Sequence, residues 1–88
     1  MKKKAKYIVY ILECADGTLY TGITTDVERR LVEHNSSTLG AKYTSARRPV
    51  RLAYTKAFKD RSAASIEESR IKKLPRERKL ELIGGLAK

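Results

Sequence analysis

Apolar residues in this chain occur in short runs whose spacing alternates between the period of a strand and that of a helix. Residues 7–14 are rich in Ile, Val and Tyr and predict a strand that is apolar on both faces. Residues 15–17, Ala-Asp-Gly, predict a turn, and residues 18–23 predict the returning strand. Residues 50–58 alternate between apolar and polar positions, so they predict a third strand.

The segment after the second strand has the pattern of a helix. Thr25 and Glu28 have the spacing of a capping box, in which each side chain binds a free backbone amide of the other residue. At about 100° per residue, His34 lies on the apolar face and Arg30 lies at the edge of that face. Arg29 lies on the opposite side, among acidic residues in solvent. We therefore expect Arg30, but not Arg29, to reach the sheet.

The second half of the chain predicts two more helices. Residues 35–48 are polar and contain a glycine, which is typical of a flexible connection. Residues 63–74 predict a helix that is capped by Asp60 or Ser62. Pro75 suits the first turn of a final helix.

These elements predict the α+β fold class, with a small three-stranded antiparallel sheet flanked by helices in the order β-β-α-β-α-α. A chain of 88 residues has the size of one domain, and neither a repeat nor a linker divides it. We expect a single domain over residues 1–88, with a core that spans about residues 5–83.

The length of the loop between the first two strands decides which side chains share a face of the sheet. A two-residue loop would place Tyr10 and Tyr20 on opposite faces, because side chains alternate along a strand. A three-residue loop, with Gly17 in the left-handed conformation, places both tyrosines on one face and Gly22 opposite Tyr10. We expect the three-residue loop.

The chain has a large excess of positive charge. Twenty Lys and Arg residues against ten Asp and Glu give a net charge of +10, which is expected of a protein that binds phosphate groups. The basic residues cluster in residues 2–6, 47–51 and 72–79. A membrane surface attracts similar clusters, but no segment pairs a basic face with Trp, Phe and Leu on the other. The charge therefore favours nucleic acid as the partner and disfavours a membrane.

Other features of the composition bear on the compartment. No apolar run approaches the ~20 residues that span a bilayer, and Glu13 and Asp16 interrupt the pattern that a signal peptide needs. Cys14 is the single cysteine, so it cannot form an internal disulfide, and we expect it to be a small buried residue. One cysteine and one histidine do not make a zinc site. We expect a cytoplasmic protein.

Four polar side chains have the chemistry that phosphodiester hydrolysis requires, if the fold brings them together. A phenol such as Tyr10 or Tyr20, with a pKa near ~10, is a poor base unless nearby cations favour the phenolate. Arg30 can supply such a charge and can hold phosphate oxygens with its planar guanidinium. His34 lies one turn further along the same helix. Gly22 would allow backbone or substrate to approach closely where a side chain would obstruct it.

A carboxylate for a metal ion is expected on the second helix. Glu67 falls near the centre of the apolar face of that helix, and Glu68 falls at its edge. A ligand that faces water belongs at an edge, which mildly favours Glu68. One carboxylate, with water and phosphate oxygens in the remaining positions, suits Mg²⁺.

The spacing of these residues resembles the signature of the GIY-YIG nuclease superfamily. The residues that carry the resemblance are Tyr10, Tyr20-Thr21-Gly22, Arg30, His34 and Glu68-Ser69-Arg70-Ile71-Lys72, together with residues 40–44 and 48–50. Over about 80 residues, the chain is similar to the small stand-alone bacterial branch of that superfamily.

The resemblance implies a role for each of five side chains. One of Tyr10 and Tyr20 would be the general base, and the other would position water or phosphate. Arg30 would stabilise the charge of the transition state. His34 would contact the leaving group or relay a proton, and Glu68 would hold a single Mg²⁺ or Mn²⁺.

The predicted function is a Mg²⁺-dependent endonuclease that hydrolyses phosphodiester bonds of branched, damaged or single-stranded DNA in repair or recombination. DNA is a more natural target than RNA here, and a partner protein would supply specificity. Lys42, Tyr43 and Arg48 are expected to bind substrate, although Lys42 and Tyr43 would serve equally well to anchor a loop. Two alternatives stay open: a non-catalytic nucleic-acid-binding module that uses the same residues to hold phosphate, and a subunit whose basic faces dock on an acidic partner.

Overall fold

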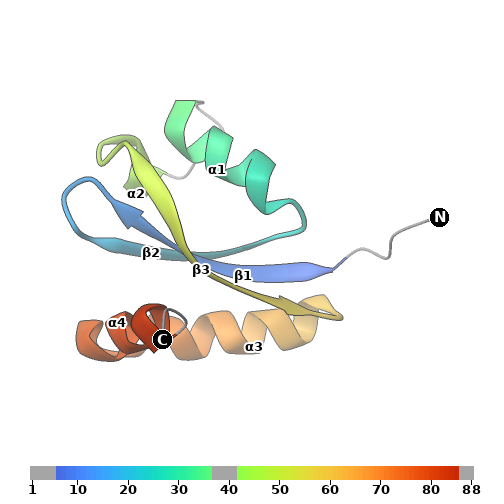
Figure 1. Ribbon diagram of the computed structural model, residues 1–88. Coiled ribbons are helices and arrows are strands. Elements are labelled where there is room, and N and C mark those ends of the chain that lie inside the picture. The colour runs from blue at the N-terminus through green and yellow to red at the C-terminus, as the bar shows by residue number, and fades with distance from the viewer. Residues whose placement is uncertain (1–5, 37–41, 86–88) are drawn as a thin grey trace.

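Three antiparallel strands form one sheet in the order β2-β1-β3, so β1 lies in the centre. The computed structural model describes residues 6–36 and 42–85 (Figure 1). Its elements are β1 (Tyr7–Cys14), β2 (Leu19–Thr24), α1 (Val27–Ser36), α2 (Lys42–Ser45), β3 (Val50–Phe58), α3 (Arg61–Lys72) and α4 (Arg76–Gly85). The α+β class and the predicted order of the main elements are confirmed. The short helix α2 lies within the segment that was predicted to be a flexible connection.

A three-residue loop joins β1 to β2. The amide of Cys14 donates to the carbonyl of Thr18 at 2.8 Å, and the amide of Gly17 donates to the carbonyl of Cys14 at 2.9 Å. Gly17 has a φ of 87°, a left-handed conformation that glycine adopts at little cost. The prediction of the loop is therefore confirmed.

The loop sets the register of the hairpin. Tyr10 pairs with Gly22, and Leu12 pairs with Tyr20, its neighbour on the same face of the sheet. Because side chains alternate along each strand, Tyr10, Gly22 and Tyr20 all lie on one face. The predicted site requires Tyr10 and Tyr20 to lie on one face of the sheet, and they do.

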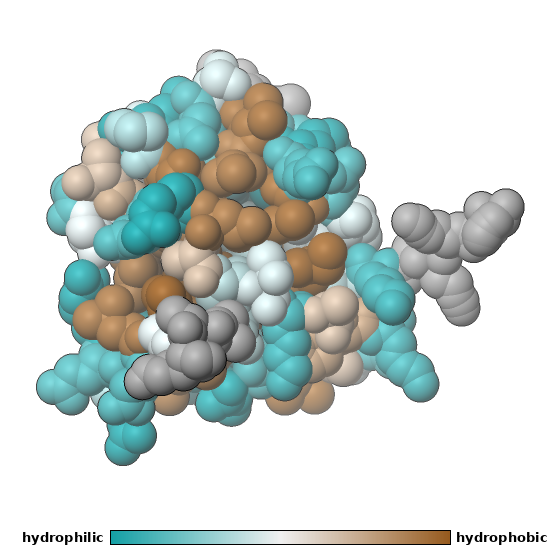
Figure 2. Space-filling model, in the orientation of Figure 1, coloured by the Kyte–Doolittle hydropathy of each residue, from teal (hydrophilic) through white to brown (hydrophobic). Residues whose placement is uncertain are grey.

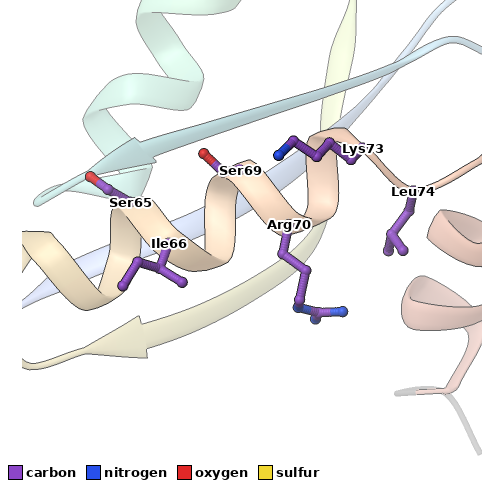
Figure 3. Close-up of a pocket in the computed structure, with 6 residues that line it drawn as sticks. All are labelled: Ser65, Ile66, Ser69, Arg70, Lys73 and Leu74. Atoms are coloured by element: carbon purple, nitrogen blue, oxygen red, sulfur yellow. The ribbon is translucent and has the colours of Figure 1, made fainter.

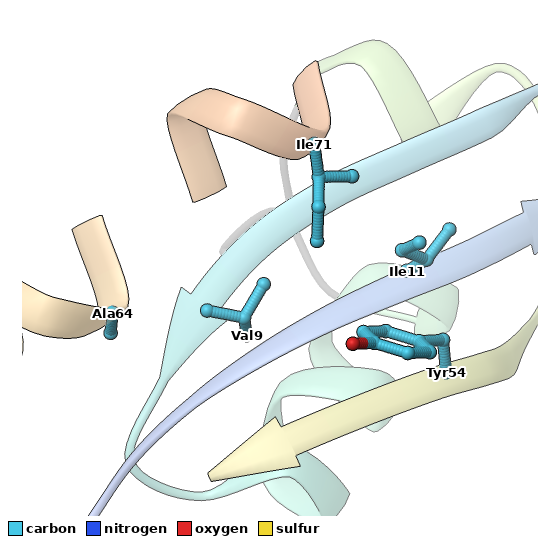
Figure 4. Close-up of a cluster of buried hydrophobic side chains, with 5 residues drawn as sticks. All are labelled: Val9, Ile11, Tyr54, Ala64 and Ile71. Atoms are coloured by element: carbon cyan, nitrogen blue, oxygen red, sulfur yellow. The ribbon is translucent and has the colours of Figure 1, made fainter. Parts of the chain in front are cut away.

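Helices cover both faces of the sheet, with α1 on one side and α3 and α4 on the other (Figure 1). A cluster of five buried residues joins the sheet to α3 (Figure 4): Val9, Ile11, Tyr54, Ala64 and Ile71. Leu82 and Ile83 of α4 pack against the same cluster. On the opposite face, α1 packs Val27 and Leu31 against a second cluster, which contains Tyr10, Leu12, Cys14 and Val50. Cys14 is buried and free, as predicted.

Helix α1 begins differently from the prediction. The cap is Asp26, whose Oδ1 accepts the amide of Arg29 at 3.1 Å, so the Thr25–Glu28 capping box is wrong. At the N-cap position of a helix, an aspartate accepts a free backbone amide at least as well as a threonine does. The helix consequently starts at Val27.

Helix α3 is capped by Asp60, which decides between the two predicted caps. The amide of Ala63 donates to Asp60 Oδ1 at 2.8 Å. The helix starts at Arg61 and ends at Lys72, two residues earlier at each end than predicted. Pro75 stands directly before α4 and accepts the amides of the first helical turn with its carbonyl.

One side chain ties the end of α1 to the start of β3. Asn35 Nδ2 donates to the carbonyl of Val50 at 3.0 Å, and the amide of Val50 donates to Asn35 Oδ1 at 2.7 Å. Asn35 thus acts towards Val50 as a neighbouring strand would, and it fixes the end of α1 that carries His34 over the sheet.

On the face shown in Figure 2, hydrophilic side chains line the margins and apolar side chains gather towards the middle. The large apolar side chains with the most exposed surface are Val32, Ile66 and Leu80. Within residues 6–36 and 42–85, no helix has both the length and the apolar character needed to cross a membrane.

Candidate active site

Tyr10 and His34 form the centre of the site. Tyr10 projects from the middle of β1 towards α1, and His34 projects from the last turns of α1 towards the sheet. The Tyr10 hydroxyl and His34 Nε2 are 3.0 Å apart. On the other side of the ring, His34 Nδ1 lies 2.8 Å from Thr44 Oγ1 of α2. All three residues are almost completely buried.

Arg30 reaches this centre from one turn earlier in α1. Its guanidinium lies near enough to the Tyr10 phenol to act on the pKa of that phenol, and it donates to Glu33 Oε1 at 2.8 Å. The adjacent Arg29 is 60% exposed and pairs with Asp26 and Glu33 at the surface. The predicted difference between the two arginines is therefore confirmed.

Tyr20 completes the group from β2. Its ring centroid lies 6.4 Å from that of Tyr10 and 5.2 Å from that of His34. Tyr10 is 2% exposed, whereas Tyr20 is half-buried. The two phenols thus differ in their access to solvent, a difference that the sequence left open.

Burial controls the protonation of the centre. Burial and, to a lesser extent, the positive charges of Arg30 and Arg48 lower the pKa of His34 to about 4, while the negative charge of Glu33 acts in the opposite direction. His34 is consequently neutral at neutral pH. The pKa of Tyr10 is raised, mainly by burial, although the nearby Arg30 guanidinium opposes that shift.

Glu68 approaches from the helix layer on the other side of the sheet. Burial is the main cause of the raised pKa of Tyr10, and the negative charge of Glu68 adds to it. Glu68 therefore lies near enough for its charge to act on Tyr10. The neighbouring Glu67 points elsewhere, because it pairs with Arg70 and acts on the pKa of Tyr54 instead. This difference supports the choice of Glu68 over Glu67.

The geometry agrees with the comparison with known protein families. Residues 6–81 match the model of the GIY-YIG catalytic domain. The chain belongs to this family. GIY-YIG is a family of nucleases, so the clustered phenols, guanidinium and carboxylate stand on a nuclease fold.

The GIY-YIG chain has relatives of similar size. A UPF0213 protein of Desulfotalea psychrophila is 57% identical over 77 residues, which are 88% of this chain and 70% of the relative. A UPF0213 protein of Syntrophus aciditrophicus is 52% identical over 79 residues, which are 90% of this chain and 91% of the relative.

Two solved structures share the fold. The solution NMR structure of a protein from E. faecalis has a TM-score of 0.65 and 42% identity, and the match covers 99% of this chain and 92% of that one. The solution NMR structure of a UPF0213 protein from Bacillus halodurans has a TM-score of 0.59 and 48% identity, with coverage of 90% and 83%.

GIY-YIG nucleases use a divalent metal ion, and the chemistry of Glu68 fits one. Its carboxylate is a hard oxygen ligand, and the side chain is 23% exposed, so water can reach it. Within the described residues, no three His, Cys, Asp or Glu side chains converge. A single carboxylate suits an ion such as Mg²⁺ that keeps most of its coordination for water and phosphate oxygens.

Gly22 and Arg48, which were predicted to bind substrate, both have contacts within the protein. A Cβ on Gly22 would lie 2.6 Å from the Tyr10 oxygen, so the space above this glycine holds the Tyr10 phenol. Arg48 Nε donates to the carbonyl of His34, and its Nη2 lies 3.5 Å from the carbonyl of Glu33. Arg48 therefore holds the end of α1. The side chains of Lys42 and Tyr43 lie outside the part of the chain that the structure describes.

Thr44 and Asn35 are the residues that sequence reasoning missed. Both contact partners that are distant in sequence, 10 residues away for Thr44 and 15 for Asn35. The available signal was weak: Thr44 belongs to residues 40–44, which resemble the family, but its neighbours do not indicate a buried hydroxyl.

Two surface hollows lie away from the tyrosines. One is on the outer side of α3 (Figure 3), and the residues that line it are Ser65, Ile66, Ser69, Arg70, Lys73 and Leu74. The other lies between α3 and α4, along Arg70, Leu74, Arg78, Glu81 and Leu82. Neither hollow contains a predicted catalytic residue. The more exposed members of the candidate site are Tyr20, Arg30 and Glu68.

Proposed function

We propose that this GIY-YIG protein is an endonuclease that hydrolyses phosphodiester bonds of DNA with one Mg²⁺ or Mn²⁺. The observation that supports the proposal best is the convergence of Tyr10, Tyr20, Arg30 and His34 on one face of the sheet, within reach of the charge of Glu68. Proteins that transfer phosphoryl groups depend mainly on positioning and on electrostatic stabilisation, and these residues supply both.

Tyr20 is the proposed general base. The phenol of Tyr10 is buried and bonded to His34, so it is poorly placed to accept a proton from a water molecule. Tyr20 lies beside it and has exposed surface. Arg30 acts beside this phenol, and its permanent charge would face the phosphoryl oxygens in the transition state.

His34 acts through Tyr10 in this proposal. The ring has no exposed surface, so a direct contact with a leaving group, one of the two roles considered for it, does not fit its position. Its contact with Tyr10 fits the other role, in which protons and hydrogen bonds pass between buried groups.

Glu68 would hold the metal ion, which when bound supplies positive charge to the scissile phosphate and activates water. A basic run follows Glu68 into α4 and would guide the nucleic-acid backbone past this carboxylate. Its exposed members are Lys72, Lys73, Arg76 and Arg78. Binding should therefore weaken steeply as salt is raised.

The proposed substrate is branched, damaged or single-stranded DNA. The proposed setting is repair or recombination in the cytoplasm. A single free cysteine, Cys14, suits a reducing compartment. Since the sequence contains no base-reading motif, a partner protein is proposed to supply specificity.

A panel of labelled DNA and RNA substrates, incubated with and without Mg²⁺, tests the function. We expect metal-dependent cleavage of DNA. This cleavage should be lost in Glu68→Gln and kept in Glu67→Gln, the matched control at the preceding position of α3. If no substrate is cut, or if both variants behave alike, the proposal is wrong.

A binding module without catalysis is the second candidate. The observation that favours it is the ion pair between Glu68 and Lys72, 3.2 Å apart, which occupies the metal-binding carboxylate. In that case the wild-type protein binds DNA with a strong salt dependence but does not cut it, and Glu68→Gln leaves the affinity unchanged in the presence of Mg²⁺.

A further inference from the structure

The buried hydrogen bonds around His34 form a chain that runs from β1 through α1 to α2. The Tyr10 phenol lies 3.0 Å from His34 Nε2, and His34 Nδ1 lies 2.8 Å from Thr44 Oγ1. Tyr10, His34 and Thr44 are each at most 2% exposed. Water therefore cannot easily replace any member of this chain.

The number of protons decides the direction of each bond. A neutral imidazole carries one N–H and one bare nitrogen, so it donates to one of its two hydroxyl neighbours and accepts from the other. The Tyr10 phenol carries one proton, and the hydrogen-bond partner that the described part of the chain offers it is His34 Nε2.

It follows that the proton of His34 is on Nδ1. In the other tautomer, Nε2–H would donate to the Tyr10 oxygen, and the buried phenol proton would have no acceptor among these groups. With the proton on Nδ1, both bonds are satisfied: Tyr10 donates to Nε2, and Nδ1–H donates to Thr44 Oγ1.

We propose that Thr44 is a positioning residue, whose hydroxyl accepts the Nδ1 proton of His34 and thereby keeps Nε2 bare to receive the Tyr10 phenol proton. Through His34, α2 sets the orientation of the Tyr10 phenol. The role of Thr44 in catalysis rests on the nuclease function proposed above, whereas the state of His34 does not.

The tautomer can be measured directly, because His34 is the one histidine of the chain. Long-range ¹H–¹⁵N correlation spectra of uniformly labelled protein at neutral pH distinguish a protonated Nδ1 from a protonated Nε2 without ambiguity of assignment. We expect the wild type to carry the proton on Nδ1. An Nε2–H tautomer in the wild type overturns the proposal, whatever the variants do.

Thr44→Val removes the acceptor and keeps the shape of the side chain. We expect the ratio of the Nδ1–H to the Nε2–H form to fall by about tenfold, the weight of one buried hydrogen bond. Thr44→Ser keeps the hydroxyl and should retain the wild-type spectrum. Thr21→Val is the matched control, since Thr21 is also buried but its hydroxyl has no partner. A natively folded Thr44→Val protein with an unchanged tautomer contradicts the proposal.

Turnover supplies an independent measurement. In Thr44→Val we expect kcat to fall by about tenfold with little change in KM, because the loss concerns a contact that matters in the transition state. Thr44→Ser should restore most of the activity. If the wild-type protein cuts no substrate, the proposed function fails, but the spectra still decide whether Thr44 fixes the tautomer.

Discussion

The phenol of Tyr10 lies so close to Gly22 that a Cβ at this glycine would be 2.6 Å from the Tyr10 oxygen and 2.8 Å from its Cζ. The two residues pair across β1 and β2, so neither can move without disturbing the hairpin. Gly22 thus provides the space in which the phenol meets His34.

Gly22→Ala should force Tyr10 out of its place. Overpacking of this kind costs roughly 1–3 kcal/mol of the free energy of unfolding, and urea unfolding measures it. Tyr10→Phe removes the nearest atom, so the same substitution should cost less in that background.

Gly84→Ala is the control for Gly22→Ala. A Cβ at Gly84 meets nothing within 4 Å, and alanine favours a helix over glycine by about 1 kcal/mol. We expect a small gain in stability there. An equal effect at both glycines would show that space at Gly22 is not limiting.

His34 should make the fold sensitive to mild acid. Burial, helped by Arg30 and Arg48, lowers its pKa to about 4 in the folded protein, against about 6.5 in an unfolded chain. Between these values the unfolded chain binds the proton more readily, so stability is full above pH ~6.5 and falls as pH drops towards ~4, by up to about 3 kcal/mol.

Urea unfolding at several pH values between neutrality and pH ~4 measures this loss. His34→Gln cannot titrate, so its stability should change less with pH over that range. Parallel pH curves for the wild type and this variant would mean that another group is responsible.

Asn35→Ala should loosen the junction between α1 and β3. It removes both hydrogen bonds to the buried Val50 and leaves an amide and a carbonyl of the backbone unpaired, at a cost of about 1–3 kcal/mol. Thermal unfolding measures the loss. Asn35→Asp keeps the acceptor for the Val50 amide and should recover part of the stability.

Arg29 and Arg30 offer a matched pair for the transition-state role. Arg30 contacts Tyr10 in the site, whereas Arg29 forms ion pairs at the surface, where such pairs add little. Arg30→Ala should lower kcat by about 10²–10³-fold, and Arg29→Ala should leave it within about twofold. A similar loss in both would point to general charge instead of a positioned guanidinium.

Several features of the site followed from local rules. The Asp-Gly turn and the alternation of side chains predicted the hairpin register, and with it the shared face of Tyr10 and Tyr20. The helical period separated Arg30 from Arg29, whereas its preference for Glu68 over Glu67 as a metal ligand stays a prediction. Each of these predictions concerns residues in one element or in two strands joined by a short loop.

Other features depended on which groups meet in three dimensions. The start of α1 was misplaced because Thr25 and Asp26 both suit a cap, and only the folded chain selects between them. The sequence left open whether backbone or substrate approaches Gly22, because it does not say that the Tyr10 ring lies there.

The sequence by itself thus determined the elements, the hairpin register and the inward-facing positions of each helix, because periodicity and turn chemistry act over a few residues. The tertiary structure alone decided that His34 is buried and neutral, that Thr44 bonds its ring, and that Glu68 acts from the opposite side of the sheet. Those outcomes depend on how separate elements pack against one another, and residues that meet only through packing leave no pattern along the chain.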